Sequence, residues 1–245
     1  MKALVISDIH SNLPALTAVF RAVQRKRLDV LFCLGDIVGY GAQPNQVLER
    51  IRRFRGQKLF VRGNHDRVAA GGDAAGFNHA ARAAALWTRD RLTPQNRRFL
   101  GGLPQGPVSD RGVTLWHGTP ADEDDYLFTP RSAREAFSRT ATEVSLFGHT
   151  HLPCAFRKEG EGELEGGLVS GESALDLEVG TRYLINPGSV GQPRDRNPSA
   201  AFGILDLDRR VFRFRRVEYD VRAAQKAILA AGLPEVLAER LEGGL

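Results

Sequence analysis

The sequence predicts a mixed α/β fold, and two patterns carry that prediction. Up to residue 66, short apolar runs typical of buried strands alternate with segments whose apolar residues recur at helical spacing, as in a mostly parallel sheet with helices on its faces. Between residues 152 and 219, strand-like runs follow one another directly, as in antiparallel sheets. The 245 residues are 42% hydrophobic, which suffices for a sizeable core. We expect one domain over 1–245, with a helical tail at about 221–245.

The elements of the first half follow in order. We expect strands at 2–7, 30–34 and 59–61. Helices are expected at 13–23, with Asn12 as the N-cap, and at 44–54, with Pro44 in the first turn. Residues 76–101 are also expected to be helical, with a second piece beginning at Thr93 and Pro94.

The second half is predicted to be richer in strands. We expect them at 113–116, 144–147, 154–157, 175–179, 183–185, 202–207 and 211–217. The acidic, glycine-rich segment 159–173 is either a hairpin or a loose loop, and the tail is interrupted at 232–234.

Composition excludes some classes of protein. No apolar run approaches the ~18 residues of a membrane helix, and the apolar start is too short for a signal peptide. Two cysteines, Cys33 and Cys154, make neither a disulfide framework nor a cysteine-rich zinc site. We therefore expect a cytoplasmic protein without a membrane partner. The net charge of +5 leaves nucleic-acid binding open without favouring it, and the oligomeric state stays open.

Five predicted strands are each followed by a turn that carries Asp, Asn or His. Singly, such residues are more often helix caps, turn formers or surface histidines. Together they contain five of the six histidines, and the carboxyl ends of strands in an open α/β sheet meet where ligands bind. The turns hold Asp8 and His10, then Asp36, then Asn64 and His65, then His117, and finally His149 and His151.

Three oxygen-bearing residues and four imidazoles form a mixed ligand set without a thiolate. Such a set suits Mn²⁺, Fe or Zn²⁺. It is too large for one ion, so we expect two metals that share a carboxylate. A pair of this kind activates a water molecule and holds the oxygens of an in-line displacement at phosphorus.

The order and spacing of these turns resemble the signature of the calcineurin-like metallophosphoesterases. The matching blocks are Asp8-Ile9-His10, Gly35-Asp36-Ile37-Val38-Gly39-Tyr40-Gly41, Gly63-Asn64-His65-Asp66, His117-Gly118 and Gly148-His149-Thr150-His151. Residues 186–194 are similar to a segment of the small bacterial branch of that superfamily. The resemblance implies a four-layer sandwich of two mixed sheets flanked by helices. It implies a phosphoesterase with two divalent metal ions, Mn²⁺ first and Fe or Zn²⁺ as alternatives, in which a metal-bridging hydroxide attacks phosphorus in line. A phosphodiesterase is expected before a phosphomonoesterase or nucleotide phosphatase, on a small phosphoester or a nucleotide.

The resemblance also implies a role for each residue. Asp8, His10 and His151 would bind the first metal, Asp36 would bridge, and Asn64, His117 and His149 would bind the second. His65 would lie over the substrate phosphate, where it either protonates the leaving oxygen or makes a simple electrostatic contact. His79 matches no motif and is interpreted as structural.

One departure from the phosphoprotein phosphatases argues against that branch. In that branch an Asp orients the active-site histidine, and an Arg follows this Asp. Gly39 and Tyr40 occupy the two positions here. Asp66 is the alternative partner for His65, although adjacent side chains seldom face each other. Members that have become protein-binding scaffolds would have lost metal ligands, and every expected ligand is present here.

For three features the sequence leaves two interpretations open. Arg194, at the end of the 186–194 segment, either pairs with a substrate phosphate beside the metals or belongs to a plain turn. Tyr40 either stacks on a base or covers the edge of the core. The acidic residues 122–125 either add metal contacts or form a solvated loop.

Overall fold

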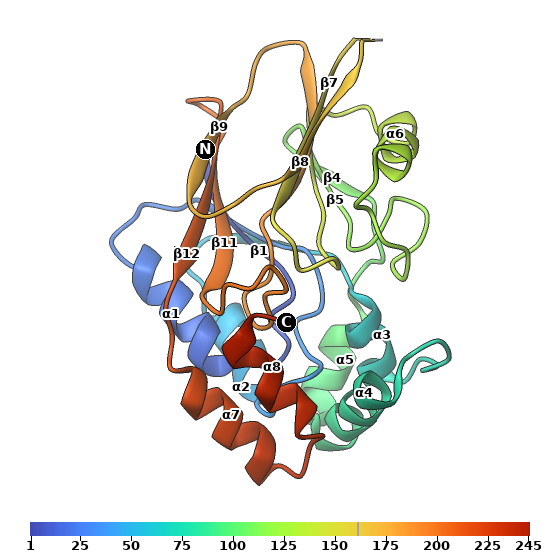
Figure 1. The fold of residues 1–245 in the computed structure, drawn as a ribbon, viewed down its shortest axis with the longest axis vertical. Helices are drawn as coiled ribbons and strands as arrows, with labels where there is room; N and C mark the ends of the chain where they lie inside the picture. The colour runs from blue at the N-terminus through green and yellow to red at the C-terminus, as the bar shows by residue number, and fades with distance from the viewer. Residues whose placement is uncertain (161) are drawn as a thin grey trace.

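In the computed structural model, which describes residues 1–160 and 162–245, the strands form two six-stranded sheets packed face to face (Figure 1). The first sheet has the order β3 (Gln57–Phe60), β2 (Val30–Cys33), β1 (Lys2–Ile6), β11 (Ala200–Asp206), β12 (Val211–Val217), β9 (Ser173–Asp176). The second has the order β4 (Val108–Asp110), β5 (Val113–Leu115), β6 (Val144–Leu146), β10 (Thr181–Asn186), β7 (Cys154–Glu159), β8 (Leu164–Leu168). Each sheet mixes parallel and antiparallel pairs, which confirms the expected sandwich.

The apolar sequence runs become strands because both of their faces are covered. Between the sheets, Phe32, Phe212 and Tyr183 are fully buried in one shared core. On the outer face of the first sheet, Leu4 and Ile6 pack against helices α1 (Leu13–Val23), α2 (Pro44–Arg52) and α5 (Pro94–Gly101). Helix α6 (Pro130–Ser138) packs on the outer face of the second sheet. The burial of both faces explains why these strands are continuously apolar rather than alternating.

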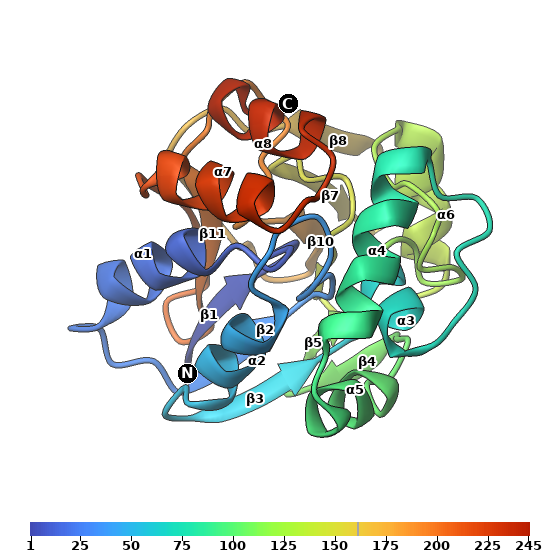
Figure 2. The ribbon, with the colours of Figure 1, turned by 90° about the horizontal axis from the view of Figure 1, so that it is seen from below.

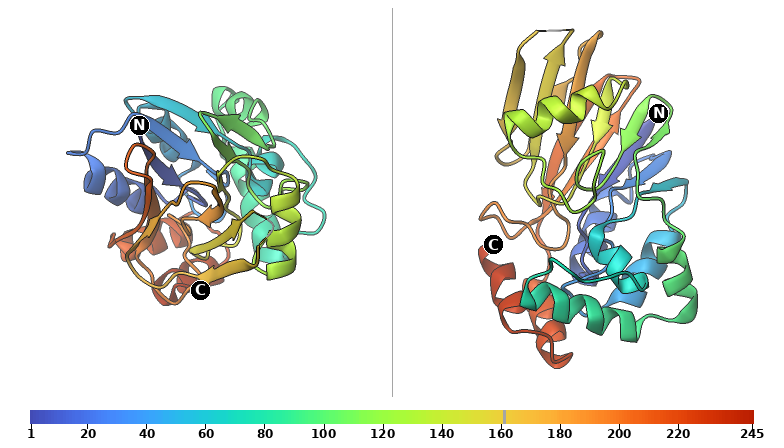
Figure 3. Two further views of the ribbon diagram at one scale, coloured as in Figure 1. Left: turned by 90° about the horizontal axis from the view of Figure 1, so that it is seen from above. Right: turned by 90° about the vertical axis from the view of Figure 1, so that its right-hand side faces the viewer.

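The remaining helices lie below the sheets, at the end where the turns after β1 and β2 lie (Figure 2; Figure 3, right). They are α3 (Asn64–Ala70), α4 (His79–Arg91), α7 (Val221–Ala230) and α8 (Val236–Gly243). Ala84 of α4, Ile228 of α7 and Leu237 of α8 share one apolar cluster with Tyr40. The helical tail therefore packs beneath the turn that follows β2.

Most expected elements are present, including the Asn12 cap, which accepts a hydrogen bond from the Ala15 amide. Three elements were not predicted: β4, α3 and α6. Strand β9 begins two residues before the expected strand at 175–179, because it pairs with β12 from Ser173 opposite Phe214. The segment 159–173 contains a hairpin partner, since β8 pairs with β7; its residue 161 lies outside the described residues.

No helix in the described part of the chain is long and apolar enough to cross a membrane.

Candidate metal centre

The turns that carry the expected ligands have an unusual backbone. Nine non-glycine residues in the described chain have positive φ, and five of them are expected metal ligands. These five are Asp8, His10, Asp36, His149 and His151, with φ between 47° and 68°. Left-handed conformations of this kind cost about 1–3 kcal/mol each, and they concentrate at functional sites. Backbone hydrogen bonds hold them here, since the amides of Asp8 and His10 donate to the carbonyls of Gly35 and Asp36.

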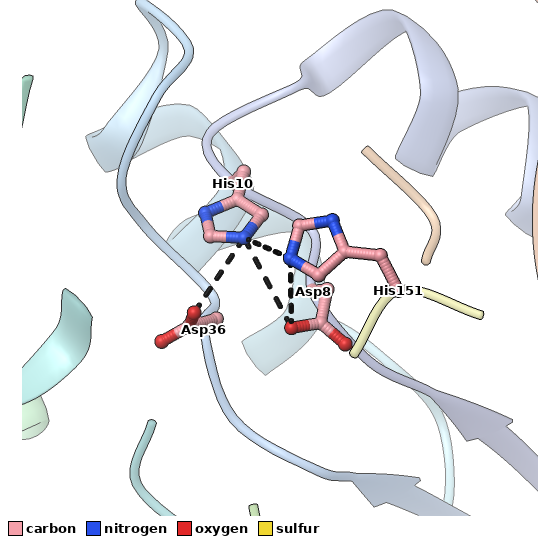
Figure 4. A group of neighbouring side chains, drawn as sticks. All are labelled: Asp8, His10, Asp36 and His151. Carbon is pink, nitrogen blue, oxygen red and sulfur yellow. Dashed lines mark hydrogen bonds and ion pairs between the residues drawn. The ribbon is translucent and has the colours of Figure 1, made fainter. Parts of the chain in front are cut away.

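A first group of ligand atoms converges from three turns (Figure 4). The Nε2 atoms of His10 and His151 lie 3.1 Å apart. Asp8 Oδ1 lies 3.4 Å from His151 Nε2, and Asp36 Oδ2 lies 3.5 Å from His10 Nε2. All four side chains are buried, and Asp8 Oδ1 has no hydrogen-bond partner among the described residues. Acceptor atoms that face one another without donors are the arrangement a cation requires.

A second group shares Asp36 with the first. Asp36 Oδ2 lies 3.4 Å from His117 Nε2, which in turn lies 3.2 Å from His149 Nδ1. One carboxylate oxygen therefore faces histidines of both groups, as expected for a bridging ligand. The other oxygen, Oδ1, accepts a hydrogen bond of 2.9 Å from the His65 amide.

Backbone carbonyls determine which nitrogen of three histidines is free to bind. His117 Nδ1 donates to the Leu34 carbonyl at 2.7 Å, and His151 Nδ1 donates to the Gln192 carbonyl at 2.5 Å. His149 Nε2 donates to the Asp124 carbonyl at 3.1 Å. The opposite nitrogen of each ring then carries the lone pair, as in metal sites whose histidines are oriented by a second hydrogen bond.

The electrostatics of the cluster fit divalent cations. Burial raises the pKa of the Asp8 carboxyl to about 7 and holds the pKa values of His10 and His151 well below their usual range. Burial opposes charge at Asp36 and His117 too, yet their mutual attraction keeps the pKa of Asp36 well below its ordinary value and raises that of His117 to about 10. Burial therefore favours neutral imidazoles at His10 and His151, whereas Asp36 holds a proton on His117. A divalent ion bound there would replace that proton, and the mixed O/N donor set suits such ions.

Asn64 and His65 enter the site as the first two residues of α3. The Oδ1 atom of Asn64 is buried and has no hydrogen-bond partner in the described chain, so this acceptor is free to bind a cation. The His65 ring lies between Tyr40 and Phe77, with centroid distances of 4.5 and 4.7 Å. Burial lowers the pKa of His65 to about 4.

Asp66 does not take the place of the missing phosphatase aspartate. Its carboxylate accepts hydrogen bonds from the amides of Val38, at 3.0 Å, and Gly63, at 3.1 Å. The alternative that Asp66 polarises His65 is therefore wrong. His65 Nδ1 is without a hydrogen-bond partner within the described residues.

Gly39 leaves no room for a carboxylate either. A Cβ atom at this position would lie 2.6 Å from His10 Nδ1 and 2.8 Å from His65 Nδ1. Its φ of +126° also disfavours any L side chain. Tyr40, which follows, is only 7% exposed and packs into the cluster of the tail helices, which favours the interpretation that it covers the core.

A pocket of about 310 Å³ opens beside both groups. Its lining includes Asp36, Asn64, His65, His149, His151 and Arg194. One guanidinium nitrogen of Arg194 donates to Gln192 Oε1 at 3.1 Å and lies 3.4 Å from the Tyr40 hydroxyl. The structure thus brings every expected site residue to one place. Asp8, His10 and His117 belong to the two groups of ligand atoms but are not among the residues that line the pocket. His79 is exposed at the start of α4, outside both groups.

The segment 186–194 supports the turns rather than merely joining strands. The Asn186 side chain donates to the Gly148 carbonyl at 2.8 Å, and the Ser189 hydroxyl donates to the Asp8 carbonyl at 2.8 Å. With the Gln192 carbonyl on His151, these bonds favour the interpretation of this segment as a rim of the site.

The acidic loop 122–125 was only partly understood from sequence. The expectation of a solvated loop is wrong for Glu123, which is 3% exposed and pairs with Arg62 and Arg67 at 3.1 and 3.2 Å. Asp124 pairs with Arg67 through its side chain and orients His149 through its carbonyl. No local pattern distinguishes Glu123 from its exposed neighbours, because its partners lie about sixty residues earlier in the chain.

Comparison with known proteins finds similarity to phosphoesterases in sequence and in structure. Residues 1–210 match the model of the calcineurin-like phosphoesterase superfamily domain. The chain is 39% identical over 243 residues to the uncharacterized protein MJ0912 of Methanocaldococcus jannaschii, covering 97% of this chain and 96% of that one. It is 27% identical over 216 residues to the phosphodiesterase YfcE of Escherichia coli, covering 85% and 89%. A metallophosphoesterase from Sphaerobacter thermophilus superposes with a TM-score of 0.89 at 37% identity, covering 100% and 99%.

Proposed function

The chain belongs to the calcineurin-like phosphoesterase superfamily, and from that premise we propose that it is a phosphodiesterase that uses two divalent metal ions. The observation that carries this proposal is Asp36, whose one carboxylate oxygen belongs to both groups of buried ligand atoms. We propose small phosphodiesters or nucleotides as substrates. Both cysteines are free and buried, which is in keeping with a reducing compartment, and we place the activity in the cytoplasm.

The preference for diesters has two supports. YfcE, a relative over most of the chain, is a phosphodiesterase. In addition, Arg194 is the one permanently cationic side chain among the described residues that line the pocket, whereas Phe77, Ala75 and Ala81 give it apolar walls. A diester carries two substituents, and the apolar walls offer a surface to one of them.

Each site residue receives a role under this proposal. Asp8, His10 and His151 would hold the first ion, Asn64, His117 and His149 the second, and Asp36 both. We propose Mn²⁺, with Fe or Zn²⁺ as alternatives that the same donor atoms accept. When bound, the ions would lower the pKa of water and neutralise charge on the phosphate oxygens.

The other residues act on the substrate directly. Arg194 pairs with a phosphate oxygen from the pocket wall, where its side chain is already held by Gln192. His65 is neutral because burial lowers its pKa to about 4, so its ring N–H donates a hydrogen bond to the leaving oxygen and keeps its proton. The proton that a leaving alkoxide requires would come from water. Its position is set by its own amide, which donates to Asp36.

The experiment compares purified protein with Mn²⁺ and the variant Asp36→Asn on bis-p-nitrophenyl phosphate and p-nitrophenyl phosphate. We expect the wild type to have the higher kcat/KM on the diester and the variant to lose the activity. Asp90→Asn, an exposed carboxylate on α4, is the matched control and should retain it. Undiminished turnover by Asp36→Asn would refute the proposed site, and a higher kcat/KM on the monoester would refute the diester preference.

A further inference from the structure

Two aromatic side chains lie exposed beside the pocket. Tyr126 is 49% and Phe128 56% exposed, and they are the only aromatic residues among the exposed large hydrophobic side chains of the described chain. Their ring centroids lie 5.9 Å apart, in the segment between β5 and α6. Of the two, only Tyr126 lines the pocket, and an exposed aromatic ring in a pocket wall typically marks a binding surface.

Tyr126 is oriented by the metal centre itself. One face of its ring stacks on His149, with centroids 4.2 Å apart and planes inclined by 27°. The residue also lines the pocket together with Asn64 and Arg194. Because one face is used by His149 and half of the side chain remains exposed, a second ring face is available to a molecule that reaches the pocket.

A second aromatic ring contributes to the pocket lining. Phe77, in the connection between α3 and α4, lines the same pocket and lies 4.7 Å from the His65 ring. An aromatic ring therefore contacts each of two site histidines: Tyr126 contacts His149, and Phe77 contacts His65. Under the proposed function a bound phosphoester would lie between these histidines.

We propose that this pocket binds a planar aromatic substituent of the phosphoester, stacked on the free face of Tyr126. The inference rests on the proposed function, which places the phosphate beside His149. A rigid ring loses little conformational freedom on binding, unlike an alkyl chain of similar area. Nucleobases and simple aryl groups share this chemistry, and the experiment distinguishes them.

The test measures binding with two matched pairs of ligands, in wild type loaded with Mn²⁺. Phenylphosphonate against methylphosphonate, measured by titration calorimetry, isolates an aryl ring on a bond that the enzyme does not hydrolyse. AMP against ribose 5-phosphate, measured as competitive inhibitors, isolates a nucleobase. We expect the aromatic member of at least one pair to bind about five-fold tighter or more, the lower end of what one stacked ring contributes.

Variants then assign the effect to the ring. In Tyr126→Leu the affinity ratio of the aromatic to the non-aromatic ligand of a pair should fall close to one. In Tyr126→Phe this affinity ratio should be retained. Phe128→Leu is the matched control, because Phe128 is equally exposed but does not line the pocket, and it should retain the ratio as well. A ratio that falls only for the nucleotide pair identifies a nucleobase, and one that falls only for the phosphonate pair identifies an aryl group.

Two outcomes would overturn the inference: ratios near one in the wild type, or ratios that survive Tyr126→Leu. Either result is distinguishable from failure of the proposed function. A wild type that hydrolyses bis-p-nitrophenyl phosphate without preferring aromatic ligands leaves the function intact and removes only the stacking site.

Discussion

Replacing Gly39 by alanine should damage both the stability and the metal affinity of the protein. The added Cβ would lie 2.6 Å from His10 Nδ1 and 2.8 Å from His65 Nδ1, at a φ of +126°. The unfavourable φ costs about 1–2 kcal/mol. Overpacking against two buried rings costs about 1–3 kcal/mol more. We therefore expect a loss of about 2–5 kcal/mol in the free energy of unfolding, measured by urea denaturation, with a fall in melting temperature of about 2–4 °C for each kcal/mol.

The contact with His10 should also weaken the first metal group, because His10 cannot remain in place beside the new methyl group. Titration calorimetry with Mn²⁺ measures this effect separately from stability. Gly112→Ala is the matched control: its φ is +81°, but no atom lies within 4 Å of the added Cβ. It should lose only the backbone contribution and should bind Mn²⁺ as the wild type does. The reasoning would be refuted if the two variants lost equal stability and both kept the Mn²⁺ affinity of the wild type, because an added Cβ at Gly39 would then not displace His10 or His65.

Three further predictions concern the two groups of candidate metal ligands, Arg194 in the pocket wall, and Glu123 in the acidic loop. Mn²⁺ at 100 times its Kd should stabilise the wild type by about 2.7 kcal/mol in scanning calorimetry, and Asp36→Asn should remove this gain. Arg194→Ala should raise KM for a diester about ten-fold or more while kcat changes little, in steady-state kinetics; an unchanged KM would exclude a phosphate contact. Glu123→Gln should cost about 2 kcal/mol in urea denaturation, less than a fully buried pair because Arg62 and Arg67 are 23% and 30% exposed; wild-type stability would contradict this pairing.

The cluster of candidate metal ligands could be predicted from sequence because the positions of these residues follow from strand ends. Asp8, Asp36 and His149 each follow an apolar run, and packing two sheets with parallel central strands brings such ends together. What the pattern could not show was the support behind them. The Leu34, Asp124 and Gln192 carbonyls that orient three histidines are backbone atoms, which any sequence supplies.

The features that were missed depend on contacts between distant segments. Glu123 is buried because it pairs with Arg62, from the turn after β3, and with Arg67, from α3, not because of its neighbours in the chain. Tyr126 belongs to a segment without helical or strand periodicity, so no pattern placed its ring on His149. Helix α6 did carry local signals, a Thr129 cap and Pro130 in the first turn, which sequence reasoning could have used.

The position of β1 has a consequence for how the chain acquires its structure on the ribosome. This strand lies in the middle of its sheet, between β2, which follows it closely in sequence, and β11, which begins only at Ala200. While the chain is being made, β1 therefore carries one unpaired edge until most of the polypeptide has emerged. Its turn, with Asp8 and His10, reaches final geometry equally late, because the Val190 and Gly191 amides donate to the Ser7 and Asp8 carbonyls. A nascent chain of this architecture completes the turn with Asp8 and His10 among its last long-range contacts, and an unpaired edge of this kind is a template for pairing with other chains.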